Sequence, residues 1–414
     1  MNLINENNQL ILDTVNLKSL AEKYQTPLFI YSYESLKMSF LDYKKELSNI
    51  KHLICYAMKS NSNHSLVKEL GGLGSGADTV SGGEIFRALK AGIDPKKIVY
   101  AGVAKKEEEI DFALNSGILM FNVESVDELE KINERAILLK KKAGIAIRVN
   151  PDVDPKTHPY ISTGLAKNKF GISIKRALEV YQYASSLSGI EVLGIHMHIG
   201  SQLLDVSPYE EAFNKVYDLY LKLEQLGIAI KYINIGGGLG IVYDSKLDKQ
   251  PRTSDMLENI TEKIKKHDLT LILEPGRSII GNAGICITKV LYHKESGIKK
   301  FVIVDAAMND VGRPSLYGAY HEILPLEEKG NEDIVADIVG GICESTDYFA
   351  RDRKINQIAQ GEYLVIKSVG AYCASMGSNY NSRLRPAEIL IKNKEVILIR
   401  ERETYEDLIL REKI

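Results

Sequence analysis

Lys59 is the first residue whose position suggests chemistry. It ends the apolar run HLICYAMK and is followed by the polar residues Ser60 and Asn61. A short apolar run with polar flanks predicts a buried strand, so the amine lies where the strand meets solvent. A lysine amine attacks carbonyl carbons once it is deprotonated, and a partly desolvated pocket lowers its pKa enough to help. A lysine that simply extends to water from a strand end is the commoner alternative.

Two glycine-containing segments have the composition of a phosphate site. GGGLG spans residues 236–240 and EPGR spans residues 274–277, and each follows an apolar run. Glycines let backbone amides approach phosphate oxygens closely. Either segment alone is equally consistent with a tight turn. Together, a lysine amine and a phosphate site suit pyridoxal phosphate, which forms a Schiff base with lysine.

Other polar residues near strand ends could serve the same cofactor. A carboxylate such as Glu274 would keep the pyridine nitrogen protonated, so that the ring accepts an electron pair; a capping role before Pro275 is the alternative. His196 and His198 alternate along one run and share a face. His198, nearer the end of the run, could stack on the cofactor ring, whereas His196 is predicted to be a hydrogen-bonded core residue. Ser201 could donate to the phosphate or cap the next helix.

Residues 52–276 repeat one pattern, in which an apolar run is followed by a turn and then by an amphipathic charged stretch. Eight such runs begin at His52, Gly76, Ile98, Leu119, Gly144, Val192, Lys231 and Thr270. Eight strands alternating with helices predict a closed (β/α)8 TIM-type barrel, in which active residues lie at the C-terminal strand ends and phosphate is bound after strands seven and eight. Lys59 would then share a rim with both glycine segments. An open doubly wound sheet is disfavoured because no GxGxxG follows the first strand.

The residues after about 278 change character. ICITKVLYHKES, KKFVIVDAAMND, EYLVIKSVGAY and EILIKNKEVILIRE predict strands linked by turns, with few long helical stretches. We therefore expect a second, mainly antiparallel β domain. The chain is α/β overall, with the barrel assigned to residues 28–277.

Composition narrows the class of ligand. The 414 residues carry a net charge of -2 without a long block of like charge, which argues against nucleic acid or anionic membrane partners. The beginning lacks a secretory signal pattern and no run of about 18 apolar residues occurs, so a cytoplasmic protein is expected. The four cysteines are scattered, which predicts neither a disulfide framework nor a metal site. Small molecules are the expected ligands.

At this point the sequence resembles pyridoxal-phosphate decarboxylases of the alanine-racemase-like fold, and most closely the diaminopimelate decarboxylase family. The likeness runs nearly end to end, through YAMKSN, SGADTVSGGE, THPYISTGL with NKFGI, HIGSQ, GGGLG, EPGR, MND, RPSLYGAYHEI, CESTD and GAYCASMGSNYNSR. The resemblance implies that residues 1–27 join residues 278–414 in the β domain. It also implies a homodimer in which each active site is completed by the partner chain.

The resemblance also assigns roles to residues. Lys59 becomes the Schiff-base lysine and Cys343 the proton donor supplied by the partner chain. The cofactor set consists of Lys59, Asp78, His198, Ser201, Gly237, Gly238, Glu274, Gly276, Arg277 and Tyr372. The substrate set consists of Arg277, Arg313, Tyr317, Glu344 and Tyr372. Metal ligands are not expected.

Some of these roles have support, or an alternative, in the residues themselves. Arg313 precedes Pro314, so it sits in a rigid turn and could hold a carboxylate bidentately, although a surface arginine is the simpler reading. Most free cysteines are inert core thiols, and only the neighbouring glycines and acidic residues support a functional role for Cys343. Arg148 could pair with an acid such as Asp78, approach the cofactor or form a structural ion pair, and its role stays open. Small-for-small departures from the family occur at Ser60, Ala307 and Cys373.

The expected reaction is the decarboxylation of meso-2,6-diaminopimelate to L-lysine and CO2. Decarboxylases of ornithine, arginine or carboxynorspermidine share the cofactor machinery, but RPSLYGAYHEI with CEST favours diaminopimelate. An amino-acid racemase is disfavoured because such enzymes set an arginine against the pyridine nitrogen, where this chain has Glu274. A non-catalytic cofactor carrier is disfavoured because Lys59, Cys343 and the second domain are all present.

Overall fold

The computed structural model describes residues 1–154, 163–164, 169–330 and 332–413. Most of the THPYISTGL segment and Asn168 of NKFGI lie outside the described residues, as does most of the loop between Asp152 and Gly171. The chain divides into two units. The barrel unit consists of Phe40–Ile241 and Lys249–Ser278, and the β unit of Met1–Ser39, Val242–Asp248 and Ile279–Ile414.

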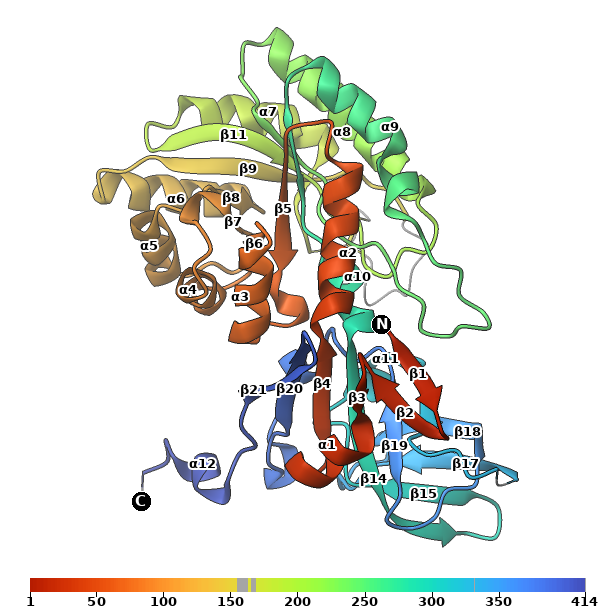
Figure 1. The fold of residues 1–414 in the computed structure, drawn as a ribbon. Helices are drawn as coiled ribbons and strands as arrows, with labels where there is room; N and C mark the ends of the chain where they lie inside the picture. Colours follow the sequence, from red (N-terminus) through yellow and green to blue (C-terminus); the bar gives the residue numbers. More distant parts are fainter. Residues whose placement is uncertain (155–162, 165–168, 331, 414) are drawn as a thin grey trace. The chain divides into compact units, whose positions relative to one another are not determined.

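Within the described residues, eight parallel strands close into a barrel (Figure 1). They are β5 (His52–Ala57), β6 (Gly76–Thr79), β7 (Ile98–Tyr100), β8 (Met120–Val123), β9 (Ala143–Asn150), β11 (Ile190–His196), β12 (Tyr232–Asn234) and β13 (Thr270–Leu273). The pairing of β8 with β9 closes the ring, with Phe121 opposite Ile145. The short β10 (Ile172–Ser173) pairs with the end of β9. The predicted TIM-type barrel and all eight of its strands are confirmed.

A helix follows each barrel strand and covers the outside of the ring (Figure 1). These helices are α3 (His64–Gly72), α4 (Gly82–Lys90), α5 (Glu107–Ser116), α6 (Val126–Leu138), α7 (Ile174–Ser186), α8 (Ser207–Gln225), α9 (Thr253–Lys266) and the short α10 (Arg277–Ile280); α2 (Tyr33–Glu46) precedes β5. Local signals set their ends. Ser81 and Ser125 cap α4 and α6 by accepting backbone N–H bonds, and Gly117 ends α5 in the left-handed conformation.

The β unit contains a three-stranded sheet and a larger, mainly antiparallel sheet. Its strands are β1 (Leu3–Glu6), β2 (Gln9–Leu12), β3 (Val15–Asn16), β4 (Leu28–Ser32), β14 (Gly284–Glu295), β15 (Lys300–Val304), β16 (Ile323–Pro325), β17 (Asp333–Val339), β18 (Tyr348–Asn356), β19 (Tyr363–Ile366), β20 (Ala387–Lys392) and β21 (Glu395–Arg400). Its helices are α1 (Leu17–Tyr24), α11 (Arg313–Tyr317) and α12 (Tyr405–Ile409). The larger sheet runs in the order β18-β17-β15-β14-β4-β20-β21, with β19 also pairing β14 and β16. The expected second, mainly antiparallel domain is confirmed.

The boundary between the units differs from the expected one. Residues 28–39 were assigned to the barrel, but β4 pairs antiparallel with β14 and parallel with β20 in the large sheet of the β unit. All five residues of β4, LFIYS, are buried. A strand buried on both faces has the same continuous apolar pattern as a barrel strand, which is why its sequence did not distinguish the two.

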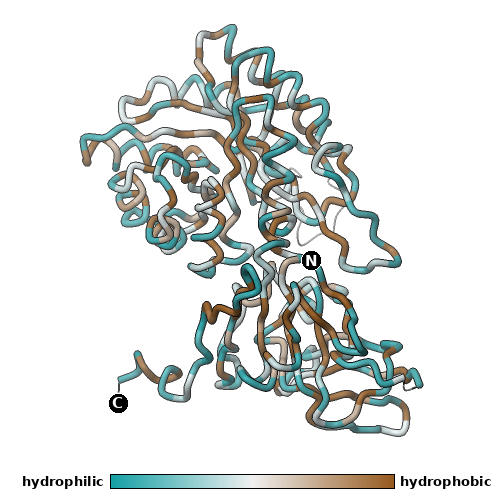
Figure 2. The backbone as a smooth tube through the Cα atoms, in the orientation of Figure 1, coloured by the Kyte–Doolittle hydropathy of each residue, from teal (hydrophilic) through white to brown (hydrophobic). Residues whose placement is uncertain are grey.

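Each unit has its own apolar core. Inside the barrel, Cys55, Met120, Ala146 and Ile272 come from four different strands and pack together in one cluster. In the β unit the core joins the first strands to the last ones, as in the cluster that contains Leu12, Ile30, Ile287, Val365 and Ile389. Hydrophobic segments therefore follow the strands of both units in Figure 2. Each core can hold the strand ends of its unit in place.

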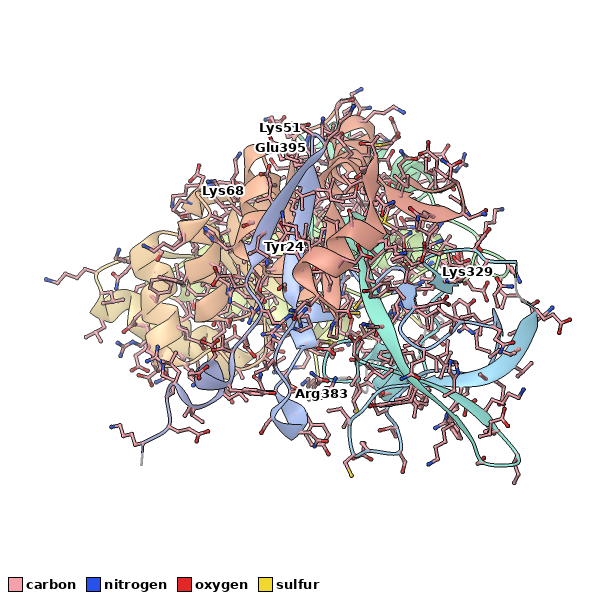
Figure 3. The ribbon with its side chains drawn as sticks, turned by 60° about the horizontal axis from the view of Figure 1, so that its bottom comes forward. Tyr24, Lys51, Lys68, Lys329, Arg383 and Glu395 are labelled. Carbon is pink, nitrogen blue, oxygen red and sulfur yellow. The ribbon has the colours of Figure 1, made fainter. Side chains whose placement is uncertain are left out.

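Charged side chains project from both units. Lys51 and Lys68 of the barrel unit and Lys329 and Glu395 of the β unit, labelled in Figure 3, are exposed. Across the described part of the chain, none of the helices has the length and apolar character needed to cross a membrane.

Candidate active site

Lys59 and Asp78 form an ion pair at the rim of the barrel. Lys59 lies in a 3-10 turn (Met58–Ser60) that directly follows β5, and Asp78 lies on the neighbouring strand β6, where Ala57 is its register partner. The Lys59 side chain is 36% exposed, whereas the Asp78 side chain is fully buried. Burial and the nearby Glu274 carboxylate raise the pKa of Asp78 to about 7, although the Lys59 ammonium opposes this rise.

Glu274 is a buried carboxylate with three polar neighbours. Its Oε1 atom accepts hydrogen bonds from Nδ2 of Asn122, at 3.0 Å, and from Nδ2 of Asn234, at 2.6 Å. Its Oε2 atom lies 3.2 Å from Nε2 of His196. Burial favours the protonated form of the acid, but the interactions with His196, Lys59 and Asn234 outweigh it and hold the pKa of Glu274 below its usual range. Glu274 is therefore a carboxylate kept ionised inside the barrel.

His198 is a neutral imidazole beside the glycine loop. Burial, assisted by the positive charges of Arg148 and Lys59, holds the pKa of His198 well below its usual value. Its Nδ1 atom accepts a hydrogen bond from the backbone N–H of Gly237 at 3.3 Å. The proton of the neutral ring is therefore on Nε2.

Arg148 forms a structural ion pair, one of the three roles that the sequence left open. Its Nη1 atom donates to Oε1 of Glu124 at 2.8 Å, and both side chains are buried. The other oxygen of Glu124 accepts the backbone N–H of Gly171 at 3.0 Å. The Arg148 guanidinium also lies over the ring of Phe170, with Cζ 4.7 Å from the ring centroid. Arg148 thus forms an internal ion pair with Glu124 and not with Asp78.

The glycines after β12 and β13 pack too tightly to carry side chains. A Cβ atom on Gly237 would lie 2.0 Å from the carbonyl oxygen of Glu274, and one on Gly238 would lie 2.2 Å from that of Gly200. Gly238 also has a φ of +112°, which other residues rarely adopt. A Cβ atom on Gly276 would lie 3.0 Å from the Ser60 side chain. The loops after strands seven and eight and the lysine turn are thus neighbours, as the barrel prediction required.

Ser201 and Arg277 are joined by hydrogen bonds. Nε and Nη2 of Arg277 donate to Oγ of Ser201 at 3.3 and 3.1 Å. Since α8 begins at Ser207 after Val206 at its N-cap, Ser201 does not cap that helix. Because its oxygen accepts from Arg277, its own O–H is oriented to donate elsewhere.

The β unit carries the remaining predicted residues. Arg313 begins α11 and is 6% exposed, and Tyr317 ends the same helix and is half-buried. Nη1 of Arg313 lies 2.9 Å from Nε2 of His321. The Nε atom of Arg313 is buried without a hydrogen-bond partner in the described structure. Tyr372 is half-buried and has a positive φ of 56°.

Cys343 and Glu344 lie in an exposed loop whose backbone is fixed by hydrogen bonds. The backbone N–H of Cys343 donates to Oδ1 of Asn381 at 2.8 Å, and the Tyr380 hydroxyl lies 3.4 Å from Oε2 of Glu344. The buried Asp347 accepts the backbone N–H of Ile342 at 2.6 Å. The loop therefore presents the thiol and the carboxylate outward while its backbone is fixed.

Comparison with known proteins identifies the family. The family model described as "Pyridoxal-dependent decarboxylase, pyridoxal binding domain" matches residues 33–281. The diaminopimelate decarboxylase of Aquifex aeolicus is 54% identical over 401 residues, which cover 97% of this chain and 95% of the relative. The chain belongs to the diaminopimelate decarboxylase family of pyridoxal-dependent decarboxylases.

Solved structures of this family share the fold. The crystal structure of diaminopimelate decarboxylase from Helicobacter pylori complexed with L-lysine is 45% identical, with a TM-score of 0.91, and the match covers 95% of this chain and 98% of that one. The structure from M. jannaschii in complex with L-lysine is 42% identical, with a TM-score of 0.94, and the match covers 100% and 98%. The family is one of enzymes, so the chain is a decarboxylase that uses pyridoxal phosphate.

The residues of the barrel unit fit this cofactor of the decarboxylase family. Glu274 is ionised, as a partner for a protonated pyridine nitrogen must be. The glycine segments have no room for side chains beside the rim. Oδ1 of Asp78 is buried without a hydrogen-bond partner in the described residues, so the rim has an unused acceptor next to Lys59. An amine, a carboxylate and a glycine cradle thus converge as the cofactor requires.

Three residues around Glu274 were not predicted as functional. Asn122 and Asn234 were not singled out, and His196 was taken as a core residue. A signal was present for the asparagines, because each interrupts an otherwise apolar run, LMFNV or YINI, near the C-terminal end of a barrel strand. Asn122 and Asn234 donate hydrogen bonds to one oxygen of the carboxylate, and His196 lies beside the other oxygen.

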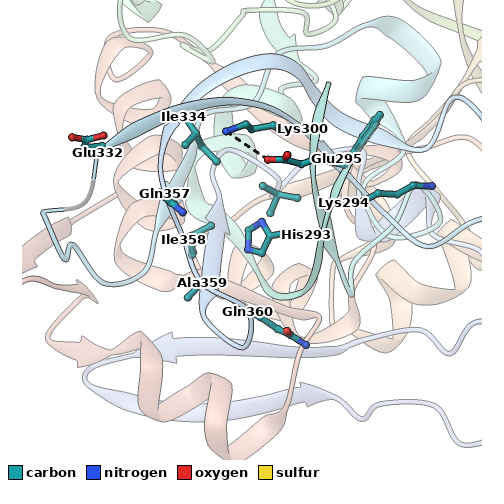
Figure 4. Close-up of a pocket in the computed structure, with 12 residues that line it drawn as sticks. His293, Lys294, Glu295, Lys300, Glu332, Ile334, Gln357, Ile358, Ala359 and Gln360 are labelled. Carbon is teal, nitrogen blue, oxygen red and sulfur yellow. Dashed lines mark ion pairs between the residues drawn. The ribbon is translucent and has the colours of Figure 1, made fainter. Parts of the chain in front are cut away.

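The β unit also contains a cavity of about 660 Å³ between β14, β15, β17 and the segment after β18. His293, Ile334 and Gln357 line it, and Glu295 and Lys300 form an ion pair of 3.6 Å at its wall (Figure 4). Its lining contains no predicted site residue of this decarboxylase. The cavity is therefore separate from the residues assigned to the reaction.

Proposed function

We propose that the chain decarboxylates meso-2,6-diaminopimelate to L-lysine and CO2, the last step of lysine biosynthesis. Relatives that bear the name diaminopimelate decarboxylase match nearly the whole chain at 54% and 47% identity. Two related structures contain L-lysine, the product of this reaction. The arrangement of charges in the two units supports the same substrate.

The barrel unit would hold the cofactor. Pyridoxal phosphate, when bound, supplies an electron sink for the pair left behind as CO2 departs. Lys59 would hold it covalently, and Glu274 would keep the pyridine nitrogen protonated. His198, as a neutral ring, would lie against the cofactor face. The phosphate set consists of Ser201, Gly237, Gly238, Gly276 and Arg277, in which Ser201 supplies an O–H donor.

Asp78 would control the protonation of Lys59. The two groups pair directly, and the pKa of Asp78 is raised to about 7. A carboxylate with a raised pKa is a stronger proton acceptor than an ordinary aspartate, so Asp78 would assist the loss of a proton from the Lys59 ammonium, which leaves the amine nucleophilic. Asp78 therefore acts on the amine that binds the cofactor.

The buried Arg313 carries the substrate assignment. In the described residues no carboxylate lies within ion-pair distance of its guanidinium, and its Nε atom has no hydrogen-bond acceptor. A buried cation without a counter-ion is costly, and a carboxylate ligand removes that cost. The substrate diaminopimelate has such a group at its distal end. We assign the distal carboxylate to Arg313 and Arg277, the distal ammonium to Glu344, and further substrate contacts to Tyr317 and Tyr372.

Proton delivery is assigned to Cys343 of a second copy of the chain. Its thiol is exposed on a loop whose backbone is fixed by Asn381, so it is presented outward from its own chain. After CO2 leaves, the thiol proton passes to the α-carbon and the product amino acid is released. The functional form would then be a homodimer with shared active sites.

The substrate assignment is tested by CO2 release from purified holoenzyme. Meso-diaminopimelate, ornithine and carboxynorspermidine are offered in parallel, and L-lysine is quantified by chromatography. The expected result is rapid CO2 release with stoichiometric L-lysine from diaminopimelate alone. Preferential turnover of ornithine or carboxynorspermidine would refute the assignment. Inactivity on all three with cofactor bound would indicate a carrier.

A further inference from the structure

Two side chains without an assigned role contact the guanidinium of Arg313. Nε2 of His321 lies 2.9 Å from Nη1, and the Tyr243 ring lies under the guanidinium, with Cζ 4.3 Å from the ring centroid. The rings of Tyr243 and His321 meet edge to face, 5.2 Å apart at 78°. All three residues belong to the β unit, so their contacts are internal to one unit. The guanidinium is thus held on one edge and one face.

The hydrogen bonds of His321 determine its tautomer. Its Nδ1 atom lies 2.8 Å from the carbonyl oxygen of Lys367. A carbonyl oxygen can only accept, so Nδ1 carries the proton, and Nε2 faces Arg313 as an acceptor. A protonated imidazole would turn a donor toward the donating Nη1. His321 is completely buried and is therefore a neutral, directed acceptor for the arginine.

The backbone around His321 is fixed by its neighbours. Nη1 of Arg353 donates to the His321 carbonyl oxygen at 3.0 Å. The next residue, Glu322, is fixed as well, because its carbonyl oxygen accepts the backbone N–H of Lys367 at 2.9 Å. Lys367 is also the residue whose carbonyl oxygen accepts from the His321 ring. The imidazole therefore has little freedom to follow Arg313 if the arginine moves.

Tyr243 is fixed by a turn that continues from the glycine loop. Asp248 accepts the backbone N–H groups of Tyr243 and Asp244 through Oδ2, at 2.8 and 3.0 Å. Tyr243 follows Gly240 by three residues in the sequence. An arginine that stacks on an aromatic face keeps its plane fixed while its edges remain available for hydrogen bonds.

We propose that His321 and Tyr243 are positioning residues that aim Arg313 at the distal carboxylate of the substrate, an inference that rests on the proposed function. Nη1 is on the side of the guanidinium that faces Cδ, and His321 occupies it. The opposite edge, formed by Nε and Nη2, has no acceptor among the described residues. That edge matches the two oxygens of a carboxylate. Substrate selection therefore depends on a histidine and a tyrosine that do not touch the substrate.

Two substitutions of His321 separate the contact of its ring with Arg313 from the contact of its ring with Lys367. In His321→Gln the side-chain oxygen can replace Nε2 as the acceptor for Arg313. In His321→Asn the amide can reach only the position of Nδ1, so the contact to Lys367 is kept and the contact to Arg313 is lost. Tyr243→Leu removes the stacked ring, and Tyr243→Phe retains it. His293→Asn, at an exposed histidine of the same unit, is the matched control.

Binding is measured on the holoenzymes by isothermal titration calorimetry with L-lysine and with cadaverine, which has the same two amines but no carboxylate. His321→Asn and Tyr243→Leu should weaken L-lysine by about tenfold and leave cadaverine within about twofold. They should raise the KM for diaminopimelate about tenfold with kcat changed by less than about threefold. His321→Gln, Tyr243→Phe and His293→Asn should stay close to wild type.

Unchanged L-lysine affinity in His321→Asn and Tyr243→Leu would overturn the inference. Equal losses for L-lysine and cadaverine would also overturn it, because they would indicate general damage to the fold. If His321→Asn does not fold, the comparison of Tyr243→Leu with Tyr243→Phe still decides the question. If instead the wild-type enzyme does not turn over diaminopimelate, the proposed function fails first, and the two failures are thereby distinguished.

Discussion

Oε2 of Glu274 lies 3.2 Å from Nε2 of the buried His196, while the two asparagines Asn122 and Asn234 occupy Oε1. The carboxylate is therefore ionised before any ligand arrives. Glu274→Gln keeps the shape but removes the charge that would hold the pyridine nitrogen protonated. We expect the rate of CO2 release to fall at least about 100-fold, with cofactor binding weakened by less than about tenfold. Single-turnover kinetics and cofactor absorbance measure the two quantities.

The control for this substitution is Glu191→Gln, on β11 of the same barrel. Glu191 is exposed and its ion pair with Lys231, at 3.3 Å, is also exposed, so its loss should be nearly neutral. A Glu274→Gln variant that keeps wild-type turnover would show that the charge of this carboxylate does not assist the reaction.

The raised pKa of Asp78 predicts a pH dependence of stability. An unfolded aspartate titrates near 3.8 and folded Asp78 near about 7, so the unfolded state loses this proton first as the pH rises. The stability contributed by protonated Asp78 is thus complete below pH 3.8 and is lost as the pH rises through about 7. Relative to wild type, Asp78→Asn should gain roughly 3 kcal/mol in free energy of unfolding between about pH 4 and pH 7. Urea unfolding of cofactor-free protein measures this, and a difference that is constant with pH would contradict it.

The fold could be predicted from sequence because barrel strands are buried on both faces. Each strand is then an unbroken apolar run, and eight of them separated by helices leave few alternatives. The same property caused the error at β4, since LFIYS is central in the other sheet and equally buried. Only its pairing with β14 and β20, far along the chain, assigns it to the β unit.

The position of a candidate site residue was predictable only where a chemically suitable residue stands at the end of a barrel strand. Lys59 and Glu274 stand at the ends of the first and last barrel strands, where the fold itself marks them. His196 has the same sequence features as a core histidine, and its contact with Glu274 depends on the closure of the ring. His321 precedes an apolar strand in the β unit, and its contact with Arg313 depends on the path of the segment between α11 and β16, which sequence periodicity does not predict.

The close packing at Gly237 predicts a large effect of one methyl group. A Cβ atom there would lie 2.0 Å from the Glu274 carbonyl oxygen, which cannot move without displacing β13. We expect Gly237→Ala to lower the free energy of unfolding by about 3 kcal/mol and to weaken cofactor binding at least about tenfold. Gly72→Ala is the control, because nothing lies within 4 Å of its added Cβ atom. If the two variants behaved equally in cofactor titration and thermal unfolding, the close packing at Gly237 would not be important for cofactor binding or stability.

The Ser60 hydroxyl should affect stability and not chemistry. Its Oγ atom lies 2.7 Å from the Ala57 carbonyl oxygen and 3.0 Å from the Tyr56 hydroxyl, inside the turn that carries Lys59. Ser60→Ala should therefore cost about 1 kcal/mol of unfolding free energy while kcat/KM changes by less than about twofold. The exposed Ser48→Ala is the reference. A large loss of kcat/KM without a loss of stability would instead place the hydroxyl in the reaction.

Shared active sites predict that two inactive variants restore each other. Lys59→Ala removes the amine and Cys343→Ala the assigned proton donor, and each should lose most production of L-lysine. If each site takes Lys59 from one chain and Cys343 from the other, a heterodimer has one site with both residues and one with neither. A one-to-one mixture that exchanges subunits should recover about a quarter of wild-type activity, since half of the dimers are mixed.

Separate affinity tags on the two variants allow the mixed dimer to be isolated and assayed by itself, where about half of wild-type activity is expected. If Lys59 and Cys343 of one site came from the same chain, the mixed dimer would contain two damaged sites, and its activity would stay at the mean of the two parents. Because the exposed Cys343 thiol points outward from its own loop, we expect restoration and not the parental mean.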